Sequence, residues 1–348
     1  MAKLRRADVN GPGIQRRRRG RGFEYVDENG ERIEDIETLE RIRELAIPPA
    51  WRDVWICPYP NGHIQAIGLD AAGRKQYRYH QRWRERRDQI KFDKMVDFAR
   101  ALPRLRGAAA RDVEGDGFPR ERVLACAVRL LDRGFFRIGG EEYAEENESY
   151  GLATMQKRHV TLEDGYVIRF DYPSKSGKQH VKSVVDPGVY DVVAALKRRR
   201  EGRELLAYQA DGAWFDVKSA DINAYIKEAT GGDFSAKDFR TWSGTVIAAI
   251  SLAAASEVAP SKTGRKRAMV NAVKEVARYL GNTPAVARAS YIDPRVFDRF
   301  ASAVTIRPAL VALGDVGELG EPAFQGEIEE AVLDLLEDEK SEAIEQVA

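Results

Sequence analysis

The spacing of apolar residues divides the chain into a β-rich part followed by a longer helical part. From residue 23 to about residue 89 the apolar residues come in short runs, which is typical of strands. Trp55-Ile56-Cys57 and the run at 63–67 flank a Pro-Asn-Gly turn, so we predict a hairpin there. Later in the chain, apolar residues at helical spacing predict helices over 119–133, 187–200, 219–230, 235–255 and 265–280.

Three further segments complete this pattern. A charged helical pattern covers residues 81–102 and ends before Pro103, and residues 107–117 are typical of a linker or loop. A short polar helix is expected over 141–150. Residues 160–185 switch to alternation, which predicts three antiparallel strands. The expected fold class is α+β, with a small antiparallel β-rich N-terminal domain and a larger, mostly helical domain that carries the three-stranded sheet.

Charge is distributed unevenly along the chain. The formal net charge is +1, but residues 311–348 hold twelve Asp or Glu and one Lys, which leaves the rest at +12. Arg16-Arg17-Arg18-Arg19 lies in a stretch without apolar periodicity. We therefore predict four segments: a disordered basic arm (1–22), the β-rich domain (23–90), the helical domain (91–310) and an acidic tail (311–348).

The basic body indicates a polyanionic partner, and nucleic acid is the commonest one. An arginine-rich composition that reflects only base usage in the gene is the alternative. The acidic tail either lies over a basic groove or is solvated, with a short helix over 328–336.

Composition excludes several classes of protein. No apolar run reaches membrane-spanning length, and the N-terminus lacks the apolar core of a secretory signal. Cys57 and Cys126 show no CxxC spacing, so we expect a reduced, cytosolic protein. The sequence contains no phosphate-loop pattern and no paired-carboxylate motif for magnesium. No metal-ligand spacing joins the four histidines, His63, His80, His159 and His180.

An unusual strand is expected at residues 75–80. In extended backbone Lys75, Tyr77 and Tyr79 point to one face, and Gln76 and Arg78 to the other. Aromatic rings among cations and an amide suit contacts with phosphates and base edges. A half-buried strand with its tyrosines in the core is the alternative.

The stretch 280–291 predicts a helix stop followed by a short helix. Gly281 ends the long pattern before it, Thr283 caps the next helix and Pro284 fits its first turn. Tyr291 then stands just past the end of that helix. A tyrosine that only packs there is the alternative.

Three cations accompany this tyrosine as candidates for phosphodiester chemistry. Arg137 follows a helix stop and lies between Phe and Ile, so it needs an anionic partner; a buried ion pair with a nearby glutamate is the alternative. Lys175 is expected at a hairpin tip, where a solvated lysine is the alternative. Ser235 and Asp238 form a capping pair that places Arg240 in the first turns of a helix, where an exposed arginine is the alternative.

Taken together, these segments resemble the small type IB DNA topoisomerases of the poxvirus-like and bacterial kind, from about residue 47 to residue 308. The most specific block is Arg137-Ile138-Gly139 with the residues that follow it. The matching blocks, in family order, are 76–79, 137–139, Tyr143, 146–148, 151–152, 158–160, the Lys175 hairpin, 237–241 and Tyr291.

The resemblance implies a reaction and a role for each residue. Tyr291 would be the nucleophile, with Arg137 and Arg240 on the phosphate and Lys175 as general acid. Asn282 would be a further donor, at a position where many relatives carry histidine. DNA contacts would come from Lys75, Gln76, Tyr77, Arg78, Tyr79, Tyr143 and Lys237.

The resemblance further implies a clamp around double-stranded DNA that relaxes supercoils through a 3′-phosphotyrosyl intermediate. It implies no ATP, metal or cofactor, and a monomer in the cytoplasm at the nucleoid. Two alternatives stay open. A tyrosine recombinase uses a similar set of Arg, Lys, Arg and Tyr, although the β-rich region at 23–89 argues against it. A non-catalytic DNA-binding clamp would leave Tyr291 a structural residue.

Overall fold

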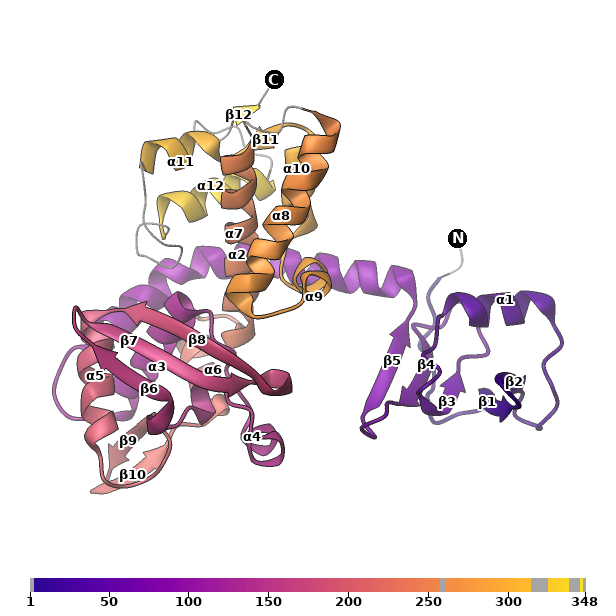
Figure 1. The fold of residues 1–348 in the computed structure, drawn as a ribbon, viewed down its shortest axis with the longest axis horizontal. Coiled ribbons are helices and arrows are strands. Elements are labelled where there is room, and N and C mark those ends of the chain that lie inside the picture. Colours follow the sequence, from indigo (N-terminus) through magenta and orange to yellow (C-terminus); the bar gives the residue numbers. More distant parts are fainter. Residues whose placement is uncertain (1–2, 257–260, 314–324, 338–344, 347–348) are drawn as a thin grey trace. The chain divides into compact units, whose positions relative to one another are not determined.

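The chain forms two compact units, residues 1–93 (unit 1) and 94–348 (unit 2) (Figure 1). The computed structural model describes residues 3–256, 261–313, 325–337 and 345–346. The side chains of Tyr143 and Ser176 lie outside the described part.

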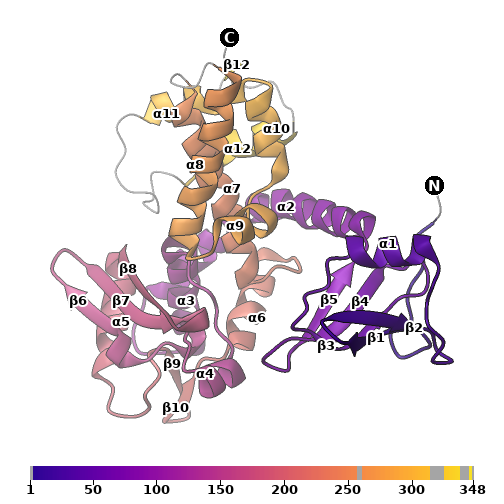
Figure 2. The ribbon, with the colours of Figure 1, turned by 45° about the vertical axis from the view of Figure 1, so that its right-hand side comes forward.

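Unit 1 is a five-stranded antiparallel sheet with one short helix against it (Figure 2). The strand order is β2-β1-β3-β4-β5. Ile42 of the helix packs with Val54, Ile56 and Ala66 of the sheet in a buried core. The elements are β1 (Ile14–Arg19), β2 (Gly22–Val26), α1 (Ile36–Glu44), β3 (Arg52–Ile56), β4 (Ile64–Leu69) and β5 (Lys75–Tyr79). The expected hairpin is confirmed, because β3 pairs with β4.

The expected disordered arm at residues 1–22 is wrong, because its arginine run forms β1. This strand pairs with β2 from Gln15 to Arg19 and with β3 at Ile14 and Gln15. Arg16 occupies an inward position, where its guanidinium donates to the carbonyl oxygens of Pro48 and Trp51 and lies 4.1 Å from the centre of the Phe23 ring. Backbone acceptors thus satisfy an arginine where an apolar residue would have made the strand visible in the sequence.

Helix α2 (Gln81–Val113) runs from unit 1 into unit 2 and continues through Pro103. The predictions of a helix end before Pro103 and of a loop from residue 107 are therefore wrong. Phe98, Leu102, Leu105 and Ala109 form a buried stripe at helical spacing on both sides of the proline. Burial of this stripe outweighs the cost of a proline inside a helix, about 3 kcal/mol for the lost hydrogen bond and the ring clash together.

A three-stranded antiparallel sheet, β6-β7-β8, forms one half of unit 2, and it confirms the predicted strands (Figure 1). Phe136 packs on Phe170 and Tyr172 of its inner face. The elements here are α3 (Arg120–Gly134), α4 (Glu141–Asn147), β6 (Val160–Glu163), β7 (Val167–Ser174), β8 (Lys178–Val185) and α5 (Pro187–Arg198). The predictions missed a short hairpin, β9 (Ala207–Ala210) with β10 (Ala213–Asp216).

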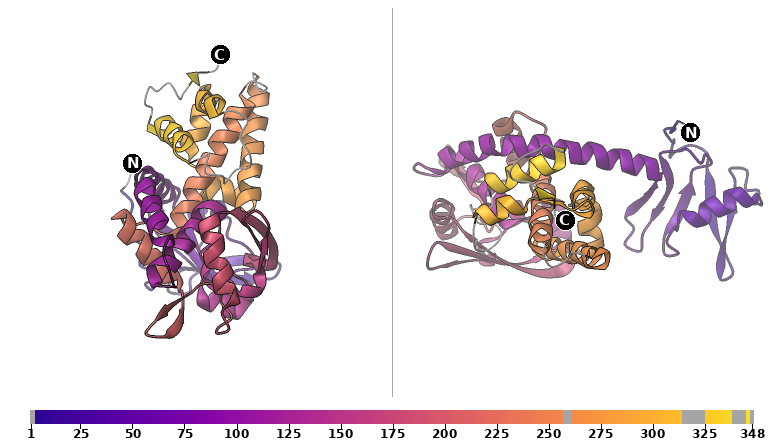
Figure 3. Two further views of the ribbon diagram at one scale, coloured as in Figure 1. Left: turned by 90° about the vertical axis from the view of Figure 1, so that its left-hand side faces the viewer. Right: turned by 90° about the horizontal axis from the view of Figure 1, so that it is seen from above.

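Helices form the rest of unit 2. Helix α7 packs along α8, and α11 and α12 lie against α7 (Figure 3). Their bounds are α6 (Ser219–Thr230), α7 (Ala236–Ala255), α8 (Lys262–Leu280), α9 (Pro284–Ser290), α10 (Pro294–Ala301), α11 (Arg307–Leu313) and α12 (Glu327–Glu337). A two-residue strand, β11 (Val304–Thr305), pairs with β12 (Glu345–Gln346).

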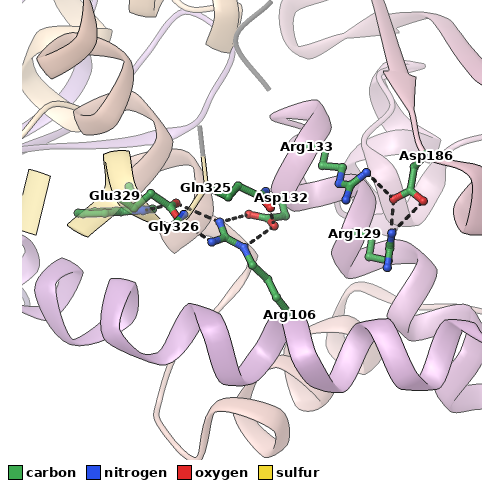
Figure 4. Close-up of polar contacts among 9 residues, drawn as sticks. Arg106, Arg129, Asp132, Arg133, Asp186, Gln325, Gly326 and Glu329 are labelled. Atoms are coloured by element: carbon green, nitrogen blue, oxygen red, sulfur yellow. Dashed lines mark hydrogen bonds and ion pairs between the residues drawn. The ribbon is translucent and has the colours of Figure 1, made fainter. Parts of the chain in front are cut away.

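Within the described residues of the predicted acidic tail, helix α12 is not solvated on all sides, because it packs on the rest of unit 2. The apolar face of α12, which includes Ile328, Val332 and Leu335, is buried. In Figure 4 the carboxylate of Glu329 meets the guanidinium of Arg106. The helix was expected from its spacing, but not its burial. Residues 314–324, 338–344 and 347–348 lie outside the described part.

Candidate active site

Arg240 lies near the start of α7 and points into the protein. The amide and hydroxyl of Ser235 donate to a carboxylate oxygen of Asp238, and this contact fixes the first turn. The side chain of Arg240 is only 3% exposed. Its Nη1 donates to the carbonyl oxygen of Phe135 (2.6 Å) and its Nη2 to that of Leu280 (2.7 Å). The alternative that Arg240 is an exposed helix arginine is therefore wrong.

Arg137 approaches the same place from the other side. Helix α3 ends at Gly134, the next residue Phe135 has a left-handed backbone (φ 53°), and Arg137 follows two residues after Phe135. Its guanidinium donates to Ser174 Oγ (3.1 Å), to the carbonyl oxygen of Gly281 (2.9 Å) and to Asn282 Oδ1 (2.6 Å). Among the described residues no carboxylate pairs with it, so the alternative of a buried ion pair with a glutamate is not observed.

The turn between α8 and α9 carries Asn282 and leads to Tyr291. Gly281 is left-handed (φ 61°) at the end of α8, and Thr283 Oγ1 accepts from Val286 N at the start of α9. Both features confirm the prediction. Tyr291 follows α9 directly, and the guanidinium carbon of Arg240 lies 5.1 Å from the centre of its ring.

Two buried donors of this cluster have no hydrogen-bond partner within the described part of the chain. They are Arg240 Nε and Asn282 Nδ2. Buried polar groups are nearly always paired, so an orphaned pair in one place indicates a site for an external acceptor. Two guanidinium groups and an amide suit the non-bridging oxygens of a phosphate.

The electrostatics of this cluster support an anion site. Burial and the neighbouring Arg137 lower the pKa of Arg240 to about 10, while Tyr291 opposes the shift. Burial, Lys182, Arg137 and Arg240 lower the pKa of His180 to about 4, so its imidazole is neutral near pH 7. Cations held this close together favour a bound anion.

His180 and Lys182 were missed by the sequence predictions. Both lie on β8, and the His180 ring fills the space where a Cβ on Gly281 would be. The signal was present as alternation, because residues 180 and 182 share a face of the strand. A histidine and a lysine near a hairpin tip are more typical of solvated positions, so the alternation alone does not indicate that they belong to the site.

Lys175 lies in a tight turn (Lys175–Gly177) between β7 and β8 and is exposed. It follows Ser174, the hydroxyl partner of Arg137. The structure therefore brings Arg137, Arg240, Asn282 and Tyr291 together, and Lys175 directly follows Ser174, which contacts Arg137. Within the described residues, no hydrogen bond joins Lys175 to the cluster.

The predicted DNA-contacting strand is β5 of unit 1. Tyr77 and Tyr79 stack with ring centres 5.9 Å apart, and each is 41% exposed, so the alternative of core tyrosines is wrong. Lys75 is exposed on the same face. Gln76 donates to Asp70, and Arg78 donates to the carbonyl oxygen of Ala46, on the opposite face.

Two other residues were expected to contact DNA. Lys237 is exposed on the first turn of α7. Tyr143 belongs to α4, and its side chain lies outside the described part. Over the described ranges, no group of three or more His, Cys, Asp or Glu is arranged to hold a metal, and no helix is long and apolar enough to span a membrane.

Clustered cations and orphaned donors beside a phenol define a site suited to phosphoryl transfer. Comparison with known families gives two matches. The family described as eukaryotic DNA topoisomerase I, catalytic core, matches residues 80–305. The family described as bacterial DNA topoisomerase IB, N-terminal domain, matches residues 22–70.

Individual relatives agree with the family matches. The DNA topoisomerase 1B of Acanthamoeba polyphaga mimivirus is 34% identical over 80% of this chain and 85% of its own length. The DNA topoisomerase I of Monkeypox virus is 21% identical over 76% of this chain and 82% of its own. The DNA topoisomerase 1 of Daucus carota is 25% identical over 45% of this chain, and the match spans only 19% of the plant protein. The chain therefore belongs to the type IB DNA topoisomerases, a family of isomerases that act on DNA.

Proposed function

We propose that this protein relaxes supercoiled DNA by cutting and rejoining one strand through Tyr291, without ATP or a metal ion. The observation that carries the proposal is the pair of orphaned donors, Arg240 Nε and Asn282 Nδ2, in the cluster where Arg240 lies against the Tyr291 ring and Asn282 contacts Arg137. A phosphodiester in this place would give both donors an acceptor.

The chemistry is a transesterification. The Tyr291 oxygen attacks the phosphorus and loses its proton to water, while the bond from phosphorus to the 5′-oxygen breaks. Arg137 and Arg240 stabilise the negative charge that builds on the non-bridging oxygens, with Asn282 as an uncharged donor. Lys175 protonates the leaving 5′-oxygen from the hairpin tip. The products are a 3′-phosphotyrosine and a free 5′-hydroxyl.

The energy balance explains why ATP is not needed. One phosphodiester is exchanged for another, so the covalent intermediate retains the energy of the broken bond for rejoining. The two arginines supply the charge stabilisation that metal ions supply in other phosphoryl transfers. The five residues of the proposed mechanism lie in one chain, so we also propose that a monomer is sufficient for activity. We propose that the protein acts in the cytoplasm, at the nucleoid.

The test is covalent trapping on supercoiled plasmid with Tyr291→Phe as the variant. The unaltered protein should relax plasmids of both supercoil signs in excess EDTA without ATP, and denaturant should trap a protein–DNA adduct. Tyr291→Phe should bind DNA normally but form no adduct. Relaxation by this variant would exclude Tyr291 as the nucleophile, and activity that requires magnesium would exclude the metal-free mechanism.

The same gel separates the two alternatives. A non-catalytic clamp would give no adduct with the unaltered protein. A tyrosine recombinase would exchange strands between two duplexes in a synaptic assembly. The match of residues 22–70 to a bacterial topoisomerase IB domain favours relaxation over recombination.

A further inference from the structure

Three successive carbonyl groups at the end of α8 each accept a hydrogen bond from a different cation. Lys182 Nζ donates to Tyr279 (2.9 Å), Arg240 Nη2 to Leu280 (2.7 Å) and Arg137 Nη2 to Gly281 (2.9 Å). The end of a helix carries partial negative charge, so cations are favoured there. Two of the three cations belong to the candidate active site, and Lys182 is the third.

Lys182 reaches this position beside two phenylalanine rings. It is partly buried on β8, and its ammonium lies 5.5 Å and 5.9 Å from the centres of the Phe135 and Phe136 rings. Among the described residues, no carboxylate pairs with it. Its hydrogen bond therefore ties the sheet to the helix end that leads into Asn282 and Tyr291.

The charged groups around Lys182 are almost all cationic. Burial, followed by Arg240 and Arg137, lowers the pKa of Lys182 to about 7. His180 on β8 is neutral near pH 7, and burial raises the pKa of Tyr172 on β7 to about 12. Arg133 of α3 is engaged elsewhere, by Asp186. From α8, Tyr279 contributes the carbonyl group, and its ring packs edge-on against Phe135.

We propose that Lys182 is a positioning residue of the strand-transfer site, which holds the end of α8 in register and takes up a proton when a phosphodiester enters. The inference rests on the proposed function, because the anion is the DNA phosphate. Lys182 acts through the turn that carries Asn282 and need not touch DNA.

The sign of the pH effect follows from linkage. In the free protein Lys182 loses its proton as the pH rises through about 7. A phosphodiester adds negative charge beside the three cations, which favours the protonated amine and raises its pKa in the complex. The rate of adduct formation at limiting DNA depends on the pKa values of the free protein, so this rate should fall above pH 7. The rate at saturating DNA depends on the pKa values of the complex, so it should stay constant to a higher pH.

The experiment measures single-turnover adduct formation from pH 6 to pH 9 at limiting and saturating DNA. Lys182→Met keeps the packing on the two phenylalanines without the charge, and Lys182→Arg keeps a charge that does not titrate in this range. Lys274→Met, an exposed lysine on α8, is the matched control.

The expected results differ for each variant. Lys182→Met should form adduct at least about tenfold more slowly at saturating DNA, because a small displacement of reacting groups costs up to about a hundredfold. It should also lose the decline above pH 7 at limiting DNA. Lys182→Arg should stay within about threefold of the unaltered protein at pH 6 and show no decline, since its charge persists. Lys274→Met should keep both the rate and the decline.

The outcomes separate this inference from the proposed function. An unaltered pH profile in either Lys182 variant would overturn the inference. If Lys182→Met fails to fold, as judged by thermal unfolding, the Lys182→Arg profile alone decides. No adduct with the unaltered protein at any pH would instead overturn the proposed function.

Discussion

At the scale of single residues, Gly244 on α7 controls how closely Tyr291 can approach the helix. A Cβ added at Gly244 would lie 2.4 Å from the carbonyl oxygen of Tyr291 and 3.2 Å from its Cβ. Neither atom is the end of a flexible side chain, so the backbone of Tyr291 would have to move. The position of the phenol relative to Arg240 therefore depends on the absence of one methyl group.

We predict that Gly244→Ala slows covalent adduct formation by about ten- to a hundredfold, because reacting groups tolerate little displacement. DNA binding should change little, since Gly244 is buried. Single-turnover trapping and a binding titration measure the two effects. Gly107→Ala on α2 is the matched control, because its Cβ would meet only Arg111 Nη1 at 3.6 Å. Equal rates for the two variants would contradict the account.

Lys175 allows a second prediction at this scale. If it protonates the leaving 5′-oxygen, a DNA substrate with sulfur at that bridging position should not need it, because a thiolate leaves readily without a proton. We expect Lys175→Ala to be slow on ordinary DNA, by about 10² or more, and largely restored on the sulfur substrate. Adduct formation on both substrates measures this. Equal defects would assign Lys175 to DNA binding instead.

The candidate site was predictable where its signals are local. Gly281 and Thr283 act through their own backbone neighbours, so the turn before Tyr291 could be predicted from the sequence. The partners of Arg137 are distant in the chain, at Ser174 and Gly281, and local patterns cannot show them. Lys182 was missed for a related reason, because its carbonyl partner belongs to another element.

At the scale of elements, helices were predicted well where one apolar stripe and its caps agree. Helix α6 has the predicted bounds, 219–230. Prediction failed for β1, where Arg16 takes an inward position, and for α2, where tertiary packing carries the helix past Pro103. In both cases contacts from distant residues outweigh a local preference.

Helix α12 provides a prediction about stability. Glu329 accepts from Trp242 Nε1 (2.8 Å) and from Arg106, which also pairs with Asp132. We predict that Glu329→Ala lowers the free energy of unfolding by about 1–3 kcal/mol, because it leaves a buried indole N–H without its acceptor and weakens a partly buried ion network. Denaturant unfolding measures this loss. Glu330→Ala, exposed on the same helix, is the control and should stay within about 0.5 kcal/mol. Equal losses would mean that the contacts of Glu329 do not stabilise α12.

At the scale of the whole molecule, we expect the positive charge of residues 1–310 to raise DNA affinity and the negative charge of residues 311–348 to lower it. The chain carries +1 in total but +12 without residues 311–348. Two carboxylates of the tail already form ion pairs within unit 2, because Glu329 pairs with Arg106 and Glu337 with Arg100. Removing the whole tail would therefore delete α12, uncover the surfaces of α7 and α10 on which it packs, and free two arginines. Neutralising six of the seven carboxylates of the tail that lie outside α12, all but Glu345 of β12, avoids both problems.

The variant for this test carries six substitutions, Asp315→Asn, Glu318→Gln, Glu321→Gln, Asp338→Asn, Glu339→Gln and Glu342→Gln. They raise the formal net charge from +1 to +7 and leave α12 intact. We predict plasmid binding at least about threefold tighter at low salt, because non-specific affinity for DNA is electrostatic. The gain should shrink as salt rises and screens the charges. Binding titrations at several salt concentrations measure both effects.

Lys340→Gln provides a control of opposite sign, because it removes the one lysine of the tail and should weaken binding slightly at low salt. Thermal unfolding should be the same for all three proteins, since the substituted residues lie outside α12. A tighter complex also leaves one plasmid more slowly, so the variant should complete more relaxation events before it moves to another. Coincident binding curves for the variant and the unaltered protein at low salt would show that the tail's charge does not act on DNA.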